Sequence, residues 1–270
     1  MSLDQAPQPD WVRCLGQGPR QVLAVHCSLA HSGEWRGLAE HLGGAVTITA
    51  FDLPGHGRAP GHDPARDLGD QATEMGQAVL DGMAGPVDLI GHSFGAVIAL
   101  RLAIENPGRI RSLTLIEPTL YAAAIHAGLP ELPEFEARMR PLFEAFAAGD
   151  TVRAAQIFTG DWGTGAAWAD LPEAQRAYIA ERIGLVEVAE PVLRHDSGRV
   201  LDRLGQIRCP VLLLGGAATP SILGRVLALI EAGLTGTTTT LVTVPGAGHM
   251  LPVTHAAEVA AAIGGFLSRV

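Results

Sequence analysis

A serine between two glycines follows an apolar run and precedes a helical pattern. Residues 87–104 read VDLIGHSFGAVIALRLAI and contain Gly91-His92-Ser93-Phe94-Gly95, a match to G-x-S-x-G. Between a strand and a helix this pattern predicts a sharp turn, in which glycines permit the crowded backbone and the serine hydroxyl is exposed. The helix N-terminus and the Phe94 N–H are then able to stabilise an oxyanion beside Ser93. Ser93 is the candidate nucleophile, and the alternative is an ordinary glycine-rich turn.

A serine nucleophile needs a neighbouring base that accepts its proton, and imidazole titrates close to neutral pH. The chain has ten histidines, so a single one carries little weight. His249 differs from the rest because it follows an expected strand, lies in the Gly-rich stretch VPGAGHMLP and precedes the last helical pattern. We therefore predict that His249 is the general base for an attack of Ser93 on an acyl carbon.

Short apolar runs that alternate with helical patterns are expected to position these two residues. The runs are continuous in Val, Leu and Ile, as in strands that helices bury on both faces. Such alternation predicts right-handed crossovers and an α/β fold with a doubly wound, mostly parallel sheet. The expected strands are Trp11–Leu15 as a short edge, Val22–Val25, Val46–Phe51, Val87–Ile90, Ser112–Ile116, Val211–Leu214 and Leu241–Val244. The expected helices are Glu34–Leu42, Gln71–Met83, Phe94–Ile104, Ser221–Ala232 and Ala256–Leu267.

The alternation stops between residues 119 and 197, where only helical patterns are found, such as Glu134–Ala148, Thr151–Phe158 and Glu173–Ile183. We predict a core formed by residues 1–118 and 198–270, with residues 119–197 inserted in it as a helical cap. Most of the chain's aromatic residues lie in this insertion. Some of these rings are expected to line a pocket beneath it, whereas the alternative is that they form a small core of its own.

Composition and charge narrow the classes of partner. The net charge of −9 and the pI near 5.5 argue against a nucleic-acid partner. No apolar stretch reaches the ~18 residues that cross a bilayer, and the N-terminus lacks the pattern of a secretory signal. Three scattered cysteines favour a reducing compartment over a disulfide framework or a zinc site. We expect a cytoplasmic protein that acts on a small-molecule acyl substrate without metal or membrane, and the oligomeric state stays open.

Three further stretches make the chain resemble the α/β-hydrolase family over nearly its whole length. VLAVHCSLAHSGEW is similar to the family's strand and oxyanion loop, with Cys27 at the usual glycine. FDLPGHGRA is similar to D-x-P-G-x-G-x-S, with Ala59 at the usual serine. VPGAGHMLPVTHAAEVAAAIGGFL is similar to the loop that delivers the family's histidine, here His249. The resemblance implies the α/β-hydrolase fold and an enzyme without a cofactor.

The same resemblance assigns roles to residues around the nucleophile. It implies an oxyanion hole formed by the N–H groups of Ser28 and Phe94, and it uses His26 to shape the oxyanion loop. Asp52 and His56 are then structural. His92 and His255 are expected to be scaffold or surface residues, although His92 is also a neighbour of the nucleophile.

The resemblance further implies an acid that holds the imidazole in the correct tautomer. Family members most often place it after the strand matching Val211–Leu214, but residues 217–219 of this chain are Ala, Ala and Thr. The other placement in the family is the end of the strand beside the nucleophile strand, where Glu117 directly follows LTLI. That position lies at the carboxyl edge of the sheet, where this fold keeps its chemistry. We predict Glu117 as the relocated acid.

Other interpretations of the acid stay open. Glu117 could cap the insertion or pair with an arginine, and the chain could use a Ser–His dyad without an acid. The remaining candidates for the carboxylate are Asp161, Asp196 and Asp202.

The predicted activity is hydrolysis of a small to medium apolar ester or lactone through an acyl-enzyme. The same residues suit C–C bond hydrolysis beside a ketone, acyl transfer or cofactor-free perhydrolysis. From another class, the alternative is a ligand-binding protein that kept the fold and lost catalysis. The side chains expected to contact the substrate are His26, Leu29, His92, Tyr121, Phe143, Trp162 and Met250.

Overall fold

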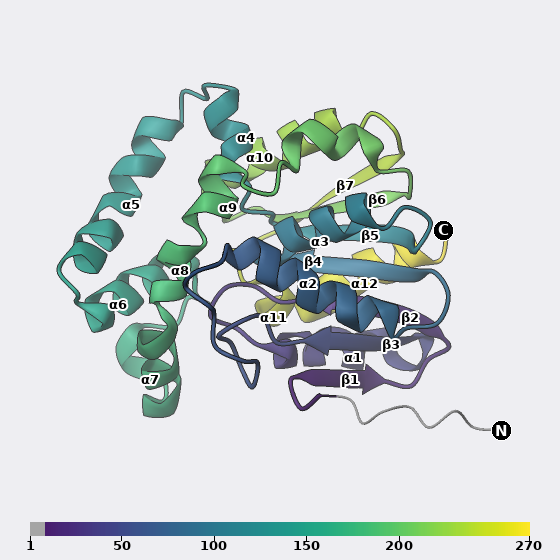
Figure 1. Ribbon diagram of the computed structural model, residues 1–270, viewed down its shortest axis with the longest axis horizontal. Coiled ribbons are helices and arrows are strands. Elements are labelled where there is room, and N and C mark those ends of the chain that lie inside the picture. Colours follow the sequence, from purple (N-terminus) through teal and green to yellow (C-terminus); the bar gives the residue numbers. More distant parts are fainter. Residues whose placement is uncertain (1–8) are drawn as a thin grey trace.

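A sheet of seven strands forms the centre of the molecule and has helices on both faces (Figure 1). The computed structural model describes residues 9–270. The strand order is β1-β3-β2-β4-β5-β6-β7, with β1 antiparallel to β3 and all other neighbours parallel. This confirms the predicted doubly wound, mostly parallel α/β sheet. The strands are β1 (Val12–Gly16), β2 (Arg20–Val25), β3 (Val46–Phe51), β4 (Val87–His92), β5 (Ile110–Ile116), β6 (Val211–Gly216) and β7 (Thr239–Val244).

Helices from different parts of the chain cover the two faces of the sheet. One face carries α1 (Arg36–Leu42), α11 (Leu251–Thr254) and α12 (Ala256–Leu267). The other carries α2 (Leu68–Asp81), α3 (Phe94–Glu105) and α10 (Ser221–Gly233). Short 3₁₀ helices lie at η1 (Ser32–Trp35), η2 (Gly43–Ala45), η3 (Trp168–Asp170) and η4 (Leu201–Gln206).

Alternate residues of each central strand enter two different hydrophobic cores. In β2, Leu23 and Val25 belong to the core that also contains side chains of α2, α3 and α10, whereas Val22 and Ala24 belong to the core that contains side chains of α1 and α12. All four side chains are fully buried. Because successive side chains of a strand point to opposite faces, burial on both faces requires a continuous apolar run. This is why the central strands are readable in the sequence as unbroken Val, Leu and Ile stretches.

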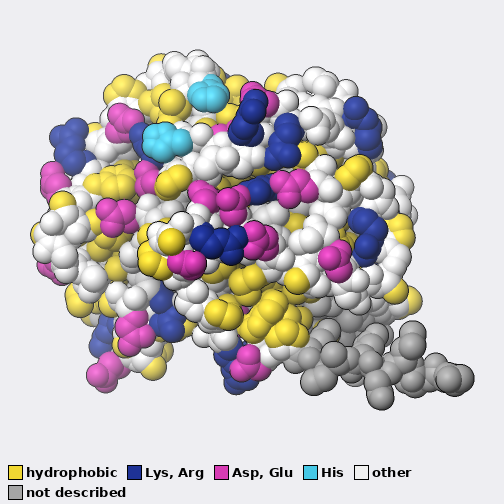
Figure 2. Space-filling model, viewed as in Figure 1, with side chains coloured by type: hydrophobic (Ala, Val, Ile, Leu, Met, Phe, Trp, Pro, Cys, Tyr) yellow, Lys and Arg dark blue, Asp and Glu magenta, His cyan; other side chains and the backbone are white. Residues whose placement is uncertain are grey.

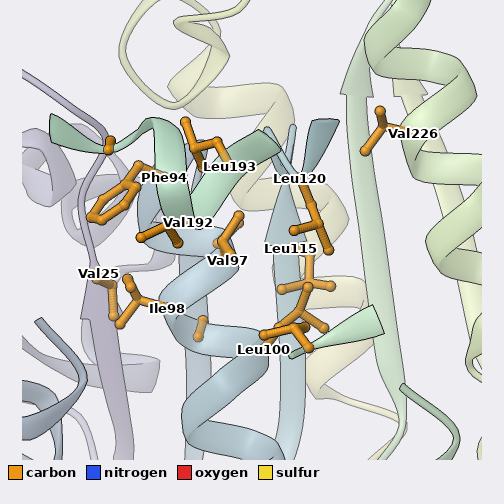
Figure 3. Packing of buried hydrophobic residues seen from close by; sticks show 14 of the residues in the cluster. Val25, Phe94, Val97, Ile98, Leu100, Leu115, Leu120, Val192, Leu193 and Val226 are labelled. Carbon is orange, nitrogen blue, oxygen red and sulfur yellow. The ribbon is translucent and has the colours of Figure 1, made fainter. Parts of the chain in front are cut away.

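Helices alone connect β5 to β6. They are α4 (Tyr121–His126), α5 (Leu132–Ala147), α6 (Thr151–Trp162), α7 (Glu173–Arg182), α8 (Gly184–Val188) and α9 (Glu190–His195), and they gather at one end of the sheet (Figure 1). Val192 and Leu193 of α9 share a buried cluster with Phe94 and Val97 at the start of α3 (Figure 3). This packing fixes the helical segment over the end of the sheet at which α3 begins.

A tyrosine adds a polar link between the helical segment and the core. The Tyr178 hydroxyl of α7 accepts a hydrogen bond from the Gly57 N–H at 2.9 Å and donates one to the Ala30 carbonyl at 3.0 Å. Ala30 belongs to the loop after β2, and Gly57 to the loop after β3. One side chain therefore holds two core loops and α7 together.

Charged side chains of both signs are interspersed on the face shown in Figure 2, and the arginines on this face do not form a continuous basic patch. The acidic excess of the chain is therefore mixed with arginines on this face rather than separated from them. Among the helices of residues 9–270, none combines the length and the apolar character that crossing a membrane demands.

Candidate active site

The carboxyl ends of the parallel strands bring the predicted site residues to one edge of the sheet. β2 and β4 are neighbours, but the chain continues from β2 to β3 on one side and from β4 to β5 on the other. A ligand crevice is expected at such a switch point. The loop after β2 supplies Ser28, β4 ends beside Ser93, β5 ends beside Glu117, and the loop after β7 supplies His249.

The turn between β4 and α3 has the crowded geometry that its glycines predict. Ser93 has φ 56° and ψ −120°, a conformation that costs energy for any residue with a Cβ. A Cβ on Gly91 would lie 2.4 Å from the Gly95 carbonyl oxygen, and a Cβ on Gly95 would lie 2.3 Å from the His26 carbonyl oxygen. Neither contact is tolerable, so both positions of the G-x-S-x-G pattern require glycine.

Ser93, His249 and Glu117 form a continuous hydrogen-bonded chain. The distance from Ser93 Oγ to His249 Nε2 is 2.9 Å, and that from His249 Nδ1 to Glu117 Oε2 is 2.8 Å. All three residues are buried, with relative exposures of 6%, 6% and 1%. The three groups come from three different strand ends, so only the folded sheet brings them together.

The partners of the His249 ring determine where its proton lies. A carboxylate only accepts hydrogen bonds, so Nδ1 carries the hydrogen that Glu117 receives. Nε2 of the neutral ring then presents a lone pair to the Ser93 hydroxyl, as proton abstraction requires. Burial lowers the pKa of His249; the hydrogen bond that Nδ1 donates to Glu117 opposes this effect, and the charge of His92 adds to it.

Glu117 is held in place by its backbone and by both carboxylate oxygens. Its N–H donates to the Leu214 carbonyl at 2.9 Å, and its φ of 45° turns the chain sharply at the end of β5. Oε1 accepts a hydrogen bond from the Gly216 N–H at 2.7 Å, which leaves Oε2 for His249. A carboxylate with two fixed partners orients the imidazole instead of moving with it.

The turn after β6 has no carboxylate, and the histidine loop passes close against it. A Cβ on Gly216 would lie 2.3 Å from the Ala247 carbonyl oxygen, two residues before His249. The Thr219 hydroxyl donates to the Gly216 carbonyl at 2.9 Å. Gly216 therefore makes room for the histidine loop, and Gly215 makes room for the Leu227 side chain of α10.

The three other candidate acids have different partners. Asp161 and Asp202 form ion pairs on outer parts of the molecule, and Asp196 accepts two backbone hydrogen bonds at the end of α9. Within residues 9–270, Glu117 is the carboxylate that His249 contacts. The partners are Arg138 for Asp161 at 2.8 Å, Arg199 for Asp202 at 3.1 Å, and the N–H groups of Val200 and Leu201 for Asp196 at 2.8 and 2.9 Å.

Two backbone N–H groups beside Ser93 have no acceptor in the described part of the chain: those of Ser28 and Phe94. Buried N–H groups are normally paired, so two unpaired donors beside a nucleophile suit an oxyanion. Cys27, at the family's glycine position, does not adopt a positive φ; the strained residue of this loop is Leu29, with φ 62°. Burial raises the pKa of the Cys27 thiol well above its ordinary value, so it remains protonated.

A second buried imidazole supports the histidine loop. His92 Nδ1 donates to Glu34 Oε1 at 2.6 Å, and His92 Nε2 donates to the His249 carbonyl at 2.9 Å. Both partners only accept, so the ring makes both contacts in its doubly protonated form, which pairs with the Glu34 carboxylate. Burial raises the pKa of Glu34, but the charge and hydrogen bond of His92 outweigh it, and the net shift is downward. The sequence did not connect Glu34 to the site, because Glu34 and His92 are 58 positions apart in the chain.

Two cavities adjoin Ser93 and His249. An open cleft of about 100 Å³ includes Leu29 and Met250 in its wall, and a more enclosed cavity of about 40 Å³ includes Tyr121. Trp162 lines both. Four of the expected contact residues thus face the space beside Ser93. Phe158, which the sequence analysis did not select, also lines both and lies one helical turn before Trp162 on α6, so helical spacing was the signal for it.

His26, His92 and Phe143 were expected to contact the substrate, but they line neither cavity. Each instead makes contacts within the protein. His26 is fully buried, and its Nε2 accepts a hydrogen bond from the Leu53 N–H at 2.9 Å. His92 is fully buried and uses both ring nitrogens in the contacts described above. Phe143 lies on α5 with its ring edge-on to Phe146 at 6.2 Å.

Cys27, Glu34 and His92 are the group in residues 9–270 whose donor atoms lie close enough for a shared metal ion, within 4.8 Å of one another. The carboxylate and both imidazole nitrogens already have hydrogen-bond partners. Glu34 Oε2 accepts from the Cys27 N–H at 3.0 Å, so the group works as a hydrogen-bond network behind the loop that follows β2.

A doubly wound sheet with a serine, an imidazole and a carboxylate hydrogen-bonded at its carboxyl edge has the arrangement of serine-dependent hydrolases. A model of the alpha/beta hydrolase family matches residues 22–262. The chain belongs to the alpha/beta hydrolase family.

Known members show how far the similarity extends. The chain is 38% identical over 104 residues to lipase LipV of Mycobacterium tuberculosis, covering 38% of this chain and 39% of that protein. It is 36% identical over 108 residues to the pimeloyl-[acyl-carrier protein] methyl ester esterase of Nitrosomonas europaea, covering 40% of each. These matches span about two fifths of the relatives' lengths. The structure of MenH from S. aureus superimposes with a TM-score of 0.67 at 19% identity, covering 97% of this chain and 99% of that one, and supports the fold.

Proposed function

We propose that the protein is a carboxylic ester hydrolase that uses Ser93 as nucleophile, His249 as general base and Glu117 as the orienting acid. The observation that carries this proposal is the unbroken contact from Ser93 Oγ through the His249 ring to Glu117, at 2.9 and 2.8 Å. Similarity to a lipase and to methyl ester esterases supports ester bonds as the target.

The geometry supports a two-step reaction. Ser93 Oγ attacks the ester carbonyl carbon while His249 Nε2 takes the hydroxyl proton, and the N–H groups of Ser28 and Phe94 donate to the oxyanion. Collapse of the tetrahedral intermediate breaks the C–O bond, and the leaving alcohol takes the proton from His249. Water then loses a proton to His249 and attacks the acyl-enzyme, which releases the acid and restores Ser93.

We further propose that α4 to α9 act as a cap over this site. Phe158 and Trp162 of α6, together with Leu171 and Ile179, give the cleft an apolar wall opposite the oxyanion loop. An apolar wall favours substrates whose arms are hydrocarbon, since their transfer from water contributes about 25 cal/mol per Å². Small to medium apolar esters therefore fit the site best.

A substrate panel tests this function. Purified protein is expected to hydrolyse aryl and alkyl esters with an optimum at short to medium chains, and to leave β-diketones intact. Cleavage of the diketones without cleavage of esters would show a C–C bond hydrolase. Transfer of the acyl group to added alcohols in preference to water would show an acyltransferase.

The pH profile of kcat/KM is expected to have its acid limb below pH 6.5. Burial, assisted by the nearby His92 cation, lowers the pKa of His249 from its ordinary 6.5, and only the neutral ring accepts the Ser93 proton. Activity is thus lost as pH falls through this lowered pKa, and it is retained at mildly acidic pH. Initial rates at low substrate concentration between about pH 4 and pH 9 measure the limb. An inflection above neutrality would contradict the assignment of the base.

Replacing His92 with asparagine is expected to move that acid limb to higher pH and to lower kcat by about tenfold. The substitution removes the cation whose charge lowers the pKa of His249, and it removes the donor that holds the His249 carbonyl. It also leaves the Glu34 carboxylate buried without its cation, which costs about 3 kcal/mol or more of folding stability.

The acid limb of the kcat/KM profile distinguishes an electrostatic effect of His92 on His249 from a loss of folding stability in the His92→Asn variant. His41→Asn, at an exposed histidine of α1, is the matched control and should leave the limb and kcat in place. An unshifted limb in a folded His92→Asn variant would show that His92 has no electrostatic effect on the base.

A further inference from the structure

The enclosed cavity and the open cleft meet at the reacting atoms. Ser28, Ser93, Phe158, Trp162 and His249 line both spaces, so an ester bound at Ser93 has room for one arm in each. The cleft reaches the surface through the exposed residues Thr164 and Gln175, whereas the walls of the cavity are mainly buried side chains. The two arms of a substrate therefore meet different environments.

The order of the reaction steps indicates which part of the ester, the alcohol or the acyl group, occupies the cleft and which occupies the cavity. In the two-step reaction proposed above, the alcohol has to leave before water attacks, while the acyl group stays attached to Ser93. The open cleft gives the alcohol a way out and water a way in. The enclosed cavity then holds the acyl group, whose arm remains in place through both steps.

The wall of the acyl cavity contains hydroxyl groups without partners. Thr119 is 4% exposed, and its Oγ1 is buried with no hydrogen-bond partner in the described part of the chain. Tyr121 is 6% exposed, and no described residue hydrogen-bonds to its hydroxyl. Leaving a buried hydroxyl unpaired is unfavourable, so the Thr119 hydroxyl is available to a ligand. The Tyr121 hydroxyl likewise has no partner in the described part of the chain that a ligand would have to displace. Both residues line the cavity, Thr119 from the short loop that follows Glu117 and Tyr121 from the start of α4.

The charges near this wall select what the hydroxyls bind. Glu190 of α9 also lines the cavity, and the arginine that it contacts, Arg194, does not. Burial raises the pKa of the Tyr121 hydroxyl, and the charges of Glu190 and Glu117 each raise it further. The smaller effect of Arg194 opposes them, so the charge close to this wall is negative on balance. An acyl arm ending in a carboxylate is repelled there, and a buried cation without a close partner is costly to desolvate. A neutral group that donates and accepts hydrogen bonds, such as an alcohol, suits the site.

We propose that Thr119 and Tyr121 form a polar subsite of the acyl cavity, which selects esters of hydroxy acids over esters of unsubstituted or dicarboxylic acids. The inference rests on the ester hydrolase function proposed above. The remaining wall, formed by Met139, Val186 and Leu193 with the two shared rings, packs against the hydrocarbon part of the same acyl group.

The test compares matched ethyl esters of butanoic, hexanoic and octanoic acids. Each is paired with esters that carry a hydroxyl at the β or terminal carbon, and with the monoethyl ester of the dicarboxylic acid of the same length. For at least one hydroxylated partner, kcat/KM should exceed that of the parent ester by about tenfold, the effect of one or two hydrogen bonds. The dicarboxylic monoesters should be the poorest substrates of the series.

Thr119→Val and Tyr121→Phe each remove a hydroxyl with little change in shape. In each variant the ratio of kcat/KM for the preferred hydroxy ester to that for its parent should fall toward one. A ratio within one protein cancels differences in the amount of active enzyme. Thr73→Val is the matched control, because the Thr73 hydroxyl donates to Gly69 within α2, and it should keep the ratio of the wild-type protein.

Binding separates failure of this inference from failure of the proposed function. Ser93→Ala protein is titrated with the same esters, with the change in intrinsic tryptophan fluorescence as the readout, since one of the four tryptophans, Trp162, lines both spaces. Tighter binding of hydroxy esters, lost on adding Thr119→Val or Tyr121→Phe, supports the subsite even where no ester is cleaved. Equal binding and equal kcat/KM for hydroxylated and parent esters, or a preference that survives both substitutions, would overturn it.

Discussion

Replacing Ser93 with alanine should lower ester turnover by about 10³-fold or more and abolish covalent labelling by a fluorophosphonate probe. The substitution removes the atom that forms the acyl-enzyme and leaves the oxyanion donors and the cavities in place. The residual rate should be that of a site that binds the ester and polarises its carbonyl without a nucleophile. Steady-state kinetics and in-gel fluorescence of the labelled protein measure the two effects.

The fold should survive this change. Ser93 keeps its strained backbone because Gly91 and Gly95 permit the close approach of β2, β4 and α3, and its side chain caps no helix. The melting temperature of the Ser93→Ala variant should therefore stay within a few degrees of the wild-type value. Ser268→Ala, at the C-terminal end of α12, is the matched control and should label and turn over like the wild-type protein.

Two outcomes would contradict the assignment. If folded wild-type protein fails to label and cleaves no ester, the alternative of a ligand-binding protein that lost catalysis is favoured. If Ser93→Ala still labels at one site, another side chain is the nucleophile.

The fold was predictable because the buried strands carry their signal locally. β3 matches the predicted Val46–Phe51, and the predicted Trp11–Leu15 corresponds to the antiparallel edge strand β1. The ends of helices were less readable. A helix was predicted from Glu34, but residues 32–35 form a 3₁₀ turn before α1, and α2 begins at Leu68 where Asp67 accepts a hydrogen bond from the Asp70 N–H at 3.0 Å.

In the helical segment between β5 and β6, the short helices could not be predicted from the sequence. Its longer helices, α5 to α7, were predicted within a few residues of their observed ends, but α4, α8 and α9 were not singled out. These helices have five or six residues each, too few for a helical period to stand out. α4 packs against α9 and α10, and α8 packs against α5, α7 and α9, contacts that the sequence does not display.

The residues of the site likewise fall into those that local motifs predict and those that only the folded structure brings together. Ser93 and His249 lie in motifs whose spacing is local, whereas the Glu34–His92 pair joins the 3₁₀ helix η1 to the end of β4, 58 residues further along the chain. Phe143 was predicted to contact substrate, but this depended on the direction of its ring, which the sequence does not show. In the structure its ring packs against Phe146. Thr119 became notable only through an unpaired hydroxyl in a cavity wall, which is a property of the folded molecule.

Replacing Glu117 with glutamine should lower kcat by about 10²- to 10⁴-fold while KM changes little. The two carboxylate oxygens now accept from the Gly216 N–H and from His249 Nδ1. An amide has a single oxygen and an NH₂ group, so it satisfies one of these donors and faces the other with a donor. If Gly216 keeps the oxygen, the amide favours the tautomer of His249 that carries its hydrogen on Nε2, and the ring is then unable to take the Ser93 proton.

The pH profile adds a signature that a merely weakened fold does not produce. The hydrogen bond and the charge of Glu117 raise the pKa of His249 against the effect of burial. Without them the pKa falls further, so the acid limb of kcat/KM in Glu117→Gln should move to lower pH than in the wild-type protein. Asp202→Asn, at an exposed carboxylate paired with Arg199, is the matched control and should leave both kcat and the limb unchanged.

Wild-type kcat in the Glu117→Gln variant would rule out a relocated acid at the end of β5. A Ser–His dyad would then be favoured, because the turn of residues 217–219 has no carboxylate to replace it. A large loss of kcat with the limb unmoved would instead give Glu117 a structural role at the junction of β5, β6 and the histidine loop. A loss of kcat together with a limb at lower pH requires that Glu117 orients and charges the imidazole itself, since Gly216, its other partner, does not titrate.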